Sequence, residues 1–217
     1  MIGQALGLSL LAAGLATLAV TVVGTGCGYW LARHDFRGRE WIDALLMLPL
    51  VLPPTVTGYY LLVLLGRQGW VGAPLARLTG ISIPFSWLAC AIAAAVMAFP
   101  LMVRAARVAF EELDPRHALA AASLGHGGVS VFLRIQLPLA RRGLAAGVVL
   151  AFARALGEFG ATLMLAGNIP GRTQTLPLLI YEAVMVGEDR TALVLSAVLT
   201  LVSVLVIVLA GKLGRRG

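Results

Sequence analysis

Two charged residues lie inside an apolar stretch, and they are the first candidates for chemistry in this chain. Arg154 and Glu158 stand four residues apart within 143–167, which predicts that they share one face of a helix. Charges at membrane depth are costly and normally face protein or water. Either Arg154 gives positive potential to an anion path while Glu158 holds it in place, or the two form a structural ion pair that locks this helix to a neighbour.

A second candidate is a run of prolines, threonines and a glycine in another apolar stretch, 42–65. Proline removes a backbone donor and breaks or kinks a helix, and broken helices at membrane depth occur where they are buried in protein or line a cavity. This run therefore predicts a gate or pathway lining, and the alternative is a packed structural kink. Its members are Pro53, Pro54, Thr55, Thr57 and Gly58.

The usual signatures of catalysis and metal binding do not occur in the sequence. There is no Gly-x4-Gly-Lys-Ser/Thr phosphate loop, and the single lysine, Lys212, is followed by leucine. Neither a Ser/His/Asp nor a His-Glu-x-x-His arrangement is present, and Cys27 and Cys90 lack metal-ligand spacing. We expect no catalytic residue, no metal site and no cofactor bound by this chain, so that any ATP hydrolysis belongs to another subunit.

Hydropathy defines the elements that position these residues. The 217 residues are 59% hydrophobic and 12% charged, with a mean hydropathy of +0.92, and about 20 apolar residues suffice to cross a bilayer. The apolar runs are continuous rather than alternating, which favours helices over a barrel. We therefore predict an all-α integral membrane protein, one domain over 1–217, whose five spans are 3–32, 42–65, 84–103, 143–167 and 191–211.

The distribution of positive charge predicts the orientation. Of 17 lysines and arginines, 12 lie in the segments between spans one and two, between spans three and four, and in the tail; only Arg67, Arg77, Arg172 and Arg190 lie on the other side. The positive-inside rule places the larger group in the cytoplasm and the N-terminus outside. Topology thus accounts for the net charge of +7, and a nucleic-acid partner is not needed.

The longest cytoplasmic segment, 111–138, predicts two short helices joined by glycines. Asp114 is a good N-cap, 116–124 is rich in alanine, Gly125 is a natural helix stop, and 129–136 forms a second helix. A rigid helix pair on a membrane face suits a groove on a partner protein. The alternative is an amphipathic helix that only links two spans.

The spacing in this segment resembles the cytoplasmic EAA loop of ABC importer permeases, where such permeases dock their ATPase. In that family an acidic residue usually precedes the two alanines, whereas Ala118 and Leu119 occupy that region here. The residues that carry the resemblance, and that it assigns to ATPase coupling, are Ala120, Ala121, Gly125, Ile135, Leu137 and Pro138.

Other segments resemble the permeases of molybdate and sulfate importers, most closely the molybdate (ModB) type. They are Leu-Ala-Phe-Ala-Arg-Ala-Leu-Gly-Glu-Phe-Gly-Ala-Thr at 150–162, Gly-Asn-Ile-Pro-Gly at 167–171, and the proline segment at 48–59. The resemblance implies the ABC importer permease fold and a homodimer that forms one path for molybdate across the bacterial inner membrane. It implies as partners two ATPase subunits, which bind ATP and Mg, and a periplasmic molybdate-binding protein.

Alternatives to that function remain open. Sulfate, thiosulfate or tungstate could be the cargo within the same family, and an autonomous channel or a secondary transporter would be a different class. Between spans four and five, 176–186 predicts a short apolar helix that could count as a sixth, re-entrant segment. Just before it, Arg172, Thr173 and Gln174 could meet an incoming anion or a binding protein, or form a solvated loop.

Overall fold

The structure, a computed structural model, describes residues 2–215; the side chains of residues 122 and 209–215 lie outside that description. All regular elements within these residues are helices. Their bounds are α1 Ile2–Arg33, α2 Arg39–Val51, α3 Pro54–Leu65, α4 Gly72–Thr79, α5 Trp87–Glu111, α6 Pro115–Ser123, α7 Gly128–Val131, the π turn η1 Phe132–Gln136, α8 Leu137–Leu156, α9 Gly160–Ala166, α10 Leu176–Met185 and α11 Asp189–Arg215.

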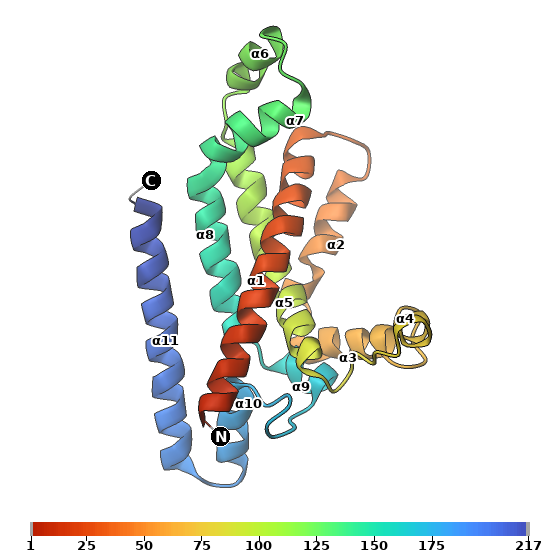
Figure 1. Cartoon of the computed structure of the whole chain (residues 1–217), viewed down its shortest axis with the longest axis vertical. Helices are drawn as coiled ribbons and strands as arrows, with labels where there is room; N and C mark the ends of the chain where they lie inside the picture. Colours follow the sequence, from red (N-terminus) through yellow and green to blue (C-terminus); the bar gives the residue numbers. More distant parts are fainter. Residues whose placement is uncertain (1, 216–217) are drawn as a thin grey trace.

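The long helices α1, α5, α8 and α11 form an elongated bundle, as Figure 1 shows. We call the end that carries α6 and α7 the loop end; the opposite end, where α10 and the N-terminus lie, is the far end. Within the described residues, four helical segments are long and apolar enough to cross a membrane, or up to five if the bent pair α2 and α3 counts as one. The predicted all-helical membrane fold with about five spans is confirmed.

The core of the bundle is built from small residues. Alanines on α1, α5 and α8 are almost wholly buried, and glycines bring the backbones together: a Cβ on Gly28 would lie 2.6 Å from Ala106 Cβ, and one on Gly147 would lie 2.7 Å from Ala105 Cβ. Small residues let helices approach closely where the surrounding lipid gives no hydrophobic driving force between them. Many large apolar side chains point outward instead, among them Leu18 on α1 and Leu193 on α11.

The predicted second span, 42–65, is two helices rather than one. α2 and α3 meet at an angle of 110°. Leu52 is extended, with ψ of 146°, because it precedes Pro53, and Pro54 then starts α3 at a position that needs no backbone donor. Figure 1 shows the result: α2 runs alongside the bundle, whereas α3 and α4 project sideways from it near the far end.

The predicted fourth span, 143–167, is also wrong in its bounds. The spanning helix is Gly128–Leu156, so it begins within the loop and ends eleven residues early. Gly157, Glu158 and Phe159 then interrupt the helix, and α9 follows as a separate short helix. The next apolar helix, α10, confirms the prediction of a short helix at 176–186 to within one residue.

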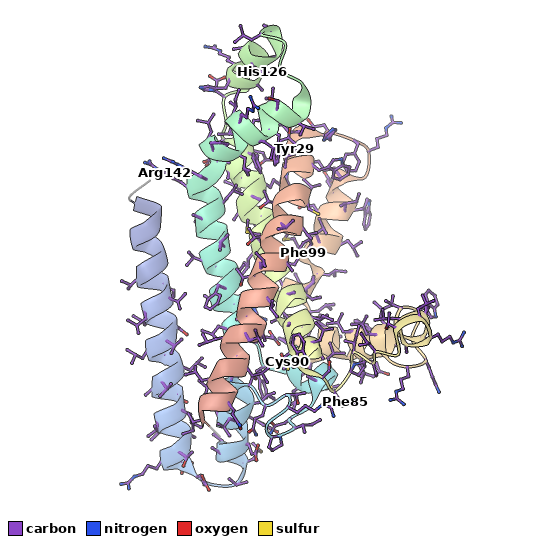
Figure 2. All side chains as sticks on the ribbon, viewed as in Figure 1. Tyr29, Phe85, Cys90, Phe99, His126 and Arg142 are labelled. Atoms are coloured by element: carbon purple, nitrogen blue, oxygen red, sulfur yellow. The ribbon has the colours of Figure 1, made fainter. Side chains whose placement is uncertain are left out.

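The basic side chains separate between the two ends of the bundle. Arg33 ends α1 and Arg39 begins α2 at the loop end, where Figure 2 also shows Arg142 and His126. Phe85 and Cys90 mark the far end in the same view. The asymmetry on which the predicted orientation rests is therefore also present in the folded chain, and by the positive-inside rule it predicts that the loop end faces the cytoplasm.

Candidate functional site

The loop between α5 and α8 has the start and the stop that its residues predict. Asp114 Oδ1 accepts a hydrogen bond from the backbone N–H of Arg116 at 2.8 Å, which caps the first turn of α6. Gly125 ends the helix in the left-handed region, with φ of 84°. The N–H of His126 then donates to the carbonyl of Ala121 at 3.2 Å, so the turn closes on the last helical residues.

The six residues assigned to coupling divide into a surface group and a packing group. Ala120, Gly125 and Pro138 are exposed, whereas Ala121 is buried, Ile135 is half-buried and Leu137 packs against the core. Large apolar side chains stand beside the surface group: Leu119 is 66% exposed, Leu124 80% and Val129 74%. The tip of the loop thus presents leucine and valine to its surroundings, including at a position where the resembling family usually carries an acid.

The second loop helix is not a separate element, contrary to the prediction. α7 passes through the π turn η1 into α8 without a break, and the N–H of Leu137 bonds to the carbonyl of Phe132. An i+5 bond of this kind accommodates one extra residue within a helix. At this level Tyr29, Phe110 and Phe132 form an aromatic cluster, with Tyr29 ring centroids 5.1 Å and 4.5 Å from the other two. The second part of the loop is therefore joined directly to the core of the bundle.

The two helix breaks lie against each other near the far end. A Cβ on Gly58 would lie 2.7 Å from the Cα of Ala161, and a Cβ on Gly160 would lie 2.9 Å from Pro54 Cβ. Only glycine at these positions permits such an approach of α3 to α9. The proline segment and the Arg154–Glu158 segment, a hundred residues apart in the chain, thus form a single structure, which we call the break junction.

The predicted gate residues occupy different faces of α3 in this junction. Pro53, Pro54 and Thr55 are exposed on the single chain, whereas Thr57 is 6% exposed and its hydroxyl lacks a hydrogen-bond partner among the described residues. Thr55 is therefore available to a path outside the chain. Thr57 faces the interior of the junction.

Arg154 and Glu158 pair, but not along one helix face as the spacing predicts. α8 ends at Leu156, and Glu158 lies in the break. Its Oε2 is 2.6 Å from Arg154 Nη1, and its Oε1 accepts the N–H of Ala161 at 2.8 Å. The carboxylate thus joins the end of α8 to the start of α9. The Glu158 side chain is 2% exposed and that of Arg154 26%.

A charged network at the loop end was not predicted. Glu111 accepts from Arg39 at 2.9 Å and from Arg107 at 2.8 Å, and Arg107 also reaches Asp43 at 2.9 Å. Arg39 pairs with Asp35 as well. Two of its ion pairs could have been predicted from the sequence, because Arg107 with Glu111 and Asp35 with Arg39 have i, i+4 spacing. The network ties α2 to the loop end of α5, so α2 is held there while its other end stops at a proline.

The segment after α9 is ordered by internal hydrogen bonds. The carbonyl of Ile169 accepts from the N–H groups of Arg172, Thr173 and Gln174, and Glu182 on α10 accepts from the Gln174 side-chain amide. Thr173 and Gln174 are buried, at 0% and 4% exposed. Of the three residues expected to meet an anion or a partner, only Arg172 is exposed.

The described residues contain no group of three or more His, Cys, Asp or Glu side chains placed to hold a metal ion. The chain combines two adjoining broken helices, a helical bundle packed through small residues, and a helical loop at one end. Broken helices that meet at membrane depth are typical of transport proteins.

The comparison with solved structures defines the class. The chain resembles the MetNI methionine ABC transporter in an inward-facing conformation, with a TM-score of 0.77, 16% identity, and coverage of 100% of this chain and 95% of that one. It therefore has the fold of the membrane-embedded permeases of ABC importers.

Sequence comparison gives the family. The family described as "Binding-protein-dependent transport system inner membrane component" matches residues 24–216, and the chain belongs to it. The chain is 46% identical over 207 residues to the molybdenum transport system permease protein ModB of Escherichia coli, covering 94% of this chain and 90% of that protein. It is 35% identical over 215 residues to the sulfate transport system permease protein CysW of Synechococcus elongatus, covering 98% and 74%.

Proposed function

We propose that this chain is the permease subunit of an ATP-driven importer for molybdate in the bacterial inner membrane. The observation that carries this proposal is the 46% identity to the ModB permease across 94% of the chain, on a structure with the importer permease fold. Two copies form one path, two cytoplasmic ATPase subunits supply energy, and a periplasmic binding protein delivers the oxyanion. ATP and Mg bind the ATPases, not this chain.

The loop α6–α7 is the ATPase contact in this proposal. Its exposed leucines fit a groove on a protein partner better than they fit water. Force applied to α7 passes through η1 into α8 without a break, because the helix is continuous from Gly128 to Leu156. Closing and opening of the ATPases therefore moves α8, and the far end of α8 is the break junction.

The break junction is the gate. Thr55 is exposed at the start of α3, beside Pro53 and Pro54. Its hydroxyl can form a hydrogen bond with a passing oxyanion without binding it tightly. A second copy facing this surface encloses the path between the two junctions. Binding of ATP favours the outward-open state and its release the inward-open state, a shift between two conformations of one assembly.

In this proposal Arg154 acts on the gate indirectly, by holding the Glu158 carboxylate in position. Both carboxylate oxygens of Glu158 have partners, one on each side of the break. A cation neutralised at 2.6 Å gives little net field to an anion, so we favour the structural interpretation of the pair. The bond keeps α8 and α9 in register while the gate changes state.

Transport by the reconstituted complex tests the proposal. The chain is placed in proteoliposomes with a candidate ATPase subunit and a candidate oxyanion-binding protein, and uptake of labelled molybdate is followed. We expect uptake that needs ATP and both partners. Uptake without ATP, or flux through the chain alone, would show a channel or a secondary carrier instead.

Sulfate is the second candidate cargo, because the match to the sulfate permease CysW spans 98% of the chain. Competition by sulfate, thiosulfate and tungstate in the same vesicles separates the candidates. We expect excess molybdate or tungstate to suppress uptake of labelled molybdate and excess sulfate to leave it largely intact. Equal suppression by sulfate would assign the chain to the sulfate branch.

A further inference from the structure

A pocket at the far end combines an apolar wall with a positively charged rim. It has a volume of about 380 Å³ and lies between the first turns of α1, the start of α5 and the ordered segment after α9. Ala5, Leu8 and Leu11 supply an apolar wall, and Trp87 stands at its edge. The exposed Arg172 supplies the charged rim, and Gln4 and the buried Gln174 also line the pocket.

The rim is rigid, which distinguishes it from a solvated loop. The N–H of Arg172 donates to Ile169 at 3.1 Å, and the segment is fastened to both neighbouring helices. The N–H of Leu176 donates to Ser9 on α1 at 2.7 Å, and Cys90 Sγ on α5 lies 3.5 Å from the carbonyl of Thr173. The position of residue 172 relative to α1 is therefore fixed before any ligand arrives.

The charge at the rim is positive and unopposed. Arg172 is exposed and forms no ion pair with the side chains that the structure describes. The nearest acid along this segment, Glu182, is occupied by the amides of Asn168 and Gln174. A phosphate group at the pocket mouth would thus meet a free guanidinium, which matches phosphate geometry well.

The pocket also lies at the right level in the membrane. Trp87 is the first residue of α5, and Leu8 and Leu11 lie in the first turns of α1, so the rim coincides with the ends of two spanning helices. Tryptophan is enriched where membrane meets water. A molecule in the pocket would have its polar head outside and its tail along α1 within the hydrocarbon.

We propose that this pocket binds an anionic phospholipid of the outer leaflet, with the phosphate on Arg172 and an acyl chain against Leu8 and Leu11. The proposal is independent of the transported ion and of the ATPase. A single basic residue near a membrane surface contributes about 1 kcal/mol towards anionic lipid, which corresponds to a preference of roughly fivefold.

Trp87 provides the probe for a direct test. Changing Trp30, Trp41 and Trp70 to phenylalanine leaves it as the sole tryptophan of the chain. Brominated phosphatidylglycerol or brominated phosphatidylcholine is titrated into the delipidated full chain in detergent. We expect saturable quenching of Trp87 fluorescence, with phosphatidylglycerol effective at roughly fivefold lower concentration.

Matched variants decide the role of the arginine. Arg172→Gln should abolish the preference for phosphatidylglycerol, Arg172→Lys should keep most of it, and Arg190→Gln, another exposed arginine at this end, should leave it unchanged. Leu11→Gln should weaken binding of both lipids. Equal quenching by the two lipids in the unmodified chain, or a preference that survives Arg172→Gln, would overturn the proposal. Displacement of lipid by soluble glycerol phosphate alone would show a plain anion site, and no quenching by either lipid would show a pocket covered by protein.

Discussion

At the residue scale, Glu158 shows how one buried carboxylate can hold two helices. One oxygen pairs with Arg154 at the end of α8 and the other accepts a backbone donor at the start of α9. Removing one partner of a buried ion pair leaves an uncompensated charge, which costs more than removing both. The two interpretations of the pair therefore differ in what a double variant will do.

We predict that Arg154→Met destabilises the chain more than the double change Arg154→Met with Glu158→Gln. The single change leaves the buried Glu158 charge without its partner. For a fully buried pair this costs up to about 3–5 kcal/mol of stability. The cost is smaller here because the Arg154 side chain is 26% exposed. The glutamine keeps an acceptor for the Ala161 N–H. Thermal unfolding in detergent measures the order of stability.

Transport by the same variants separates structure from function. If the pair is structural, the double variant should assemble and carry molybdate at near-normal rates. If Arg154 acts on the anion directly, the double variant should assemble and fail to transport. Normal stability and transport in both variants would contradict both interpretations.

Gly125 supports a second prediction at this scale. Its φ of 84° is unfavourable for a β-branched residue by about 1–2 kcal/mol, although there is open space where a side chain would go. Gly125→Val should therefore disturb the turn after α6 and reduce ATPase-coupled transport several-fold without impairing insertion of the spans. Gly127→Ala is the control, since Gly127 has φ of −70° and equal space. Pull-down of the ATPase with each variant measures docking, and normal docking and transport by Gly125→Val would refute a coupling role.

At the element scale, α3 and α9 approach each other closely through Gly58, so we expect them to move together. We predict that Gly58→Ala destabilises the chain by about 1–3 kcal/mol, because the new Cβ would lie 2.7 Å from the Cα of Ala161. Gly26→Ala in α1 should be neutral or stabilising, because nothing lies within 4 Å of its Cβ position and alanine favours a helix. Thermal unfolding of both variants checks the difference, and equal midpoints would mean that the two helices separate freely.

Apolar runs predicted the number and class of the elements, and the prolines predicted the break within 42–65. Hydropathy alone counts this segment as one span, whereas Pro53 and Pro54 mark the place where it bends by 110°. The interruption at Glu158 was missed because Gly157 and Phe159 are compatible with an apolar helix. The two breaks meet through tertiary packing at Gly58 and Gly160. Local sequence patterns carry no information on such packing.

At the scale of the whole molecule, the exposed Thr55 and the buried Thr57 make the gate testable. We predict that a cysteine at position 55, in a chain lacking Cys27 and Cys90, reacts with a water-soluble thiol reagent at a rate that changes when the ATPases are locked with ATP. A cysteine at position 57 should react slowly in every state, because Thr57 is buried within the chain. Cysteines at Leu61 and Leu62 serve as references. A residue 55 that stays unreactive in all nucleotide states would remove α3 from the path.

The π turn takes up one extra residue between the loop and the bundle. Each residue of an α-helix turns the chain by about 100°, and the extra residue that η1 accommodates between Phe132 and Leu137 is one such increment. The i+5 bond takes up this increment locally and α6 follows directly from α5, so deleting a single residue there would restore regular winding without swinging the loop around the axis of α8. In the proposed importer, the surface that the loop offers to an ATPase therefore tolerates this one-residue change, whereas the same deletion within the regular winding of α8 would turn the flanking side chains by about 100°.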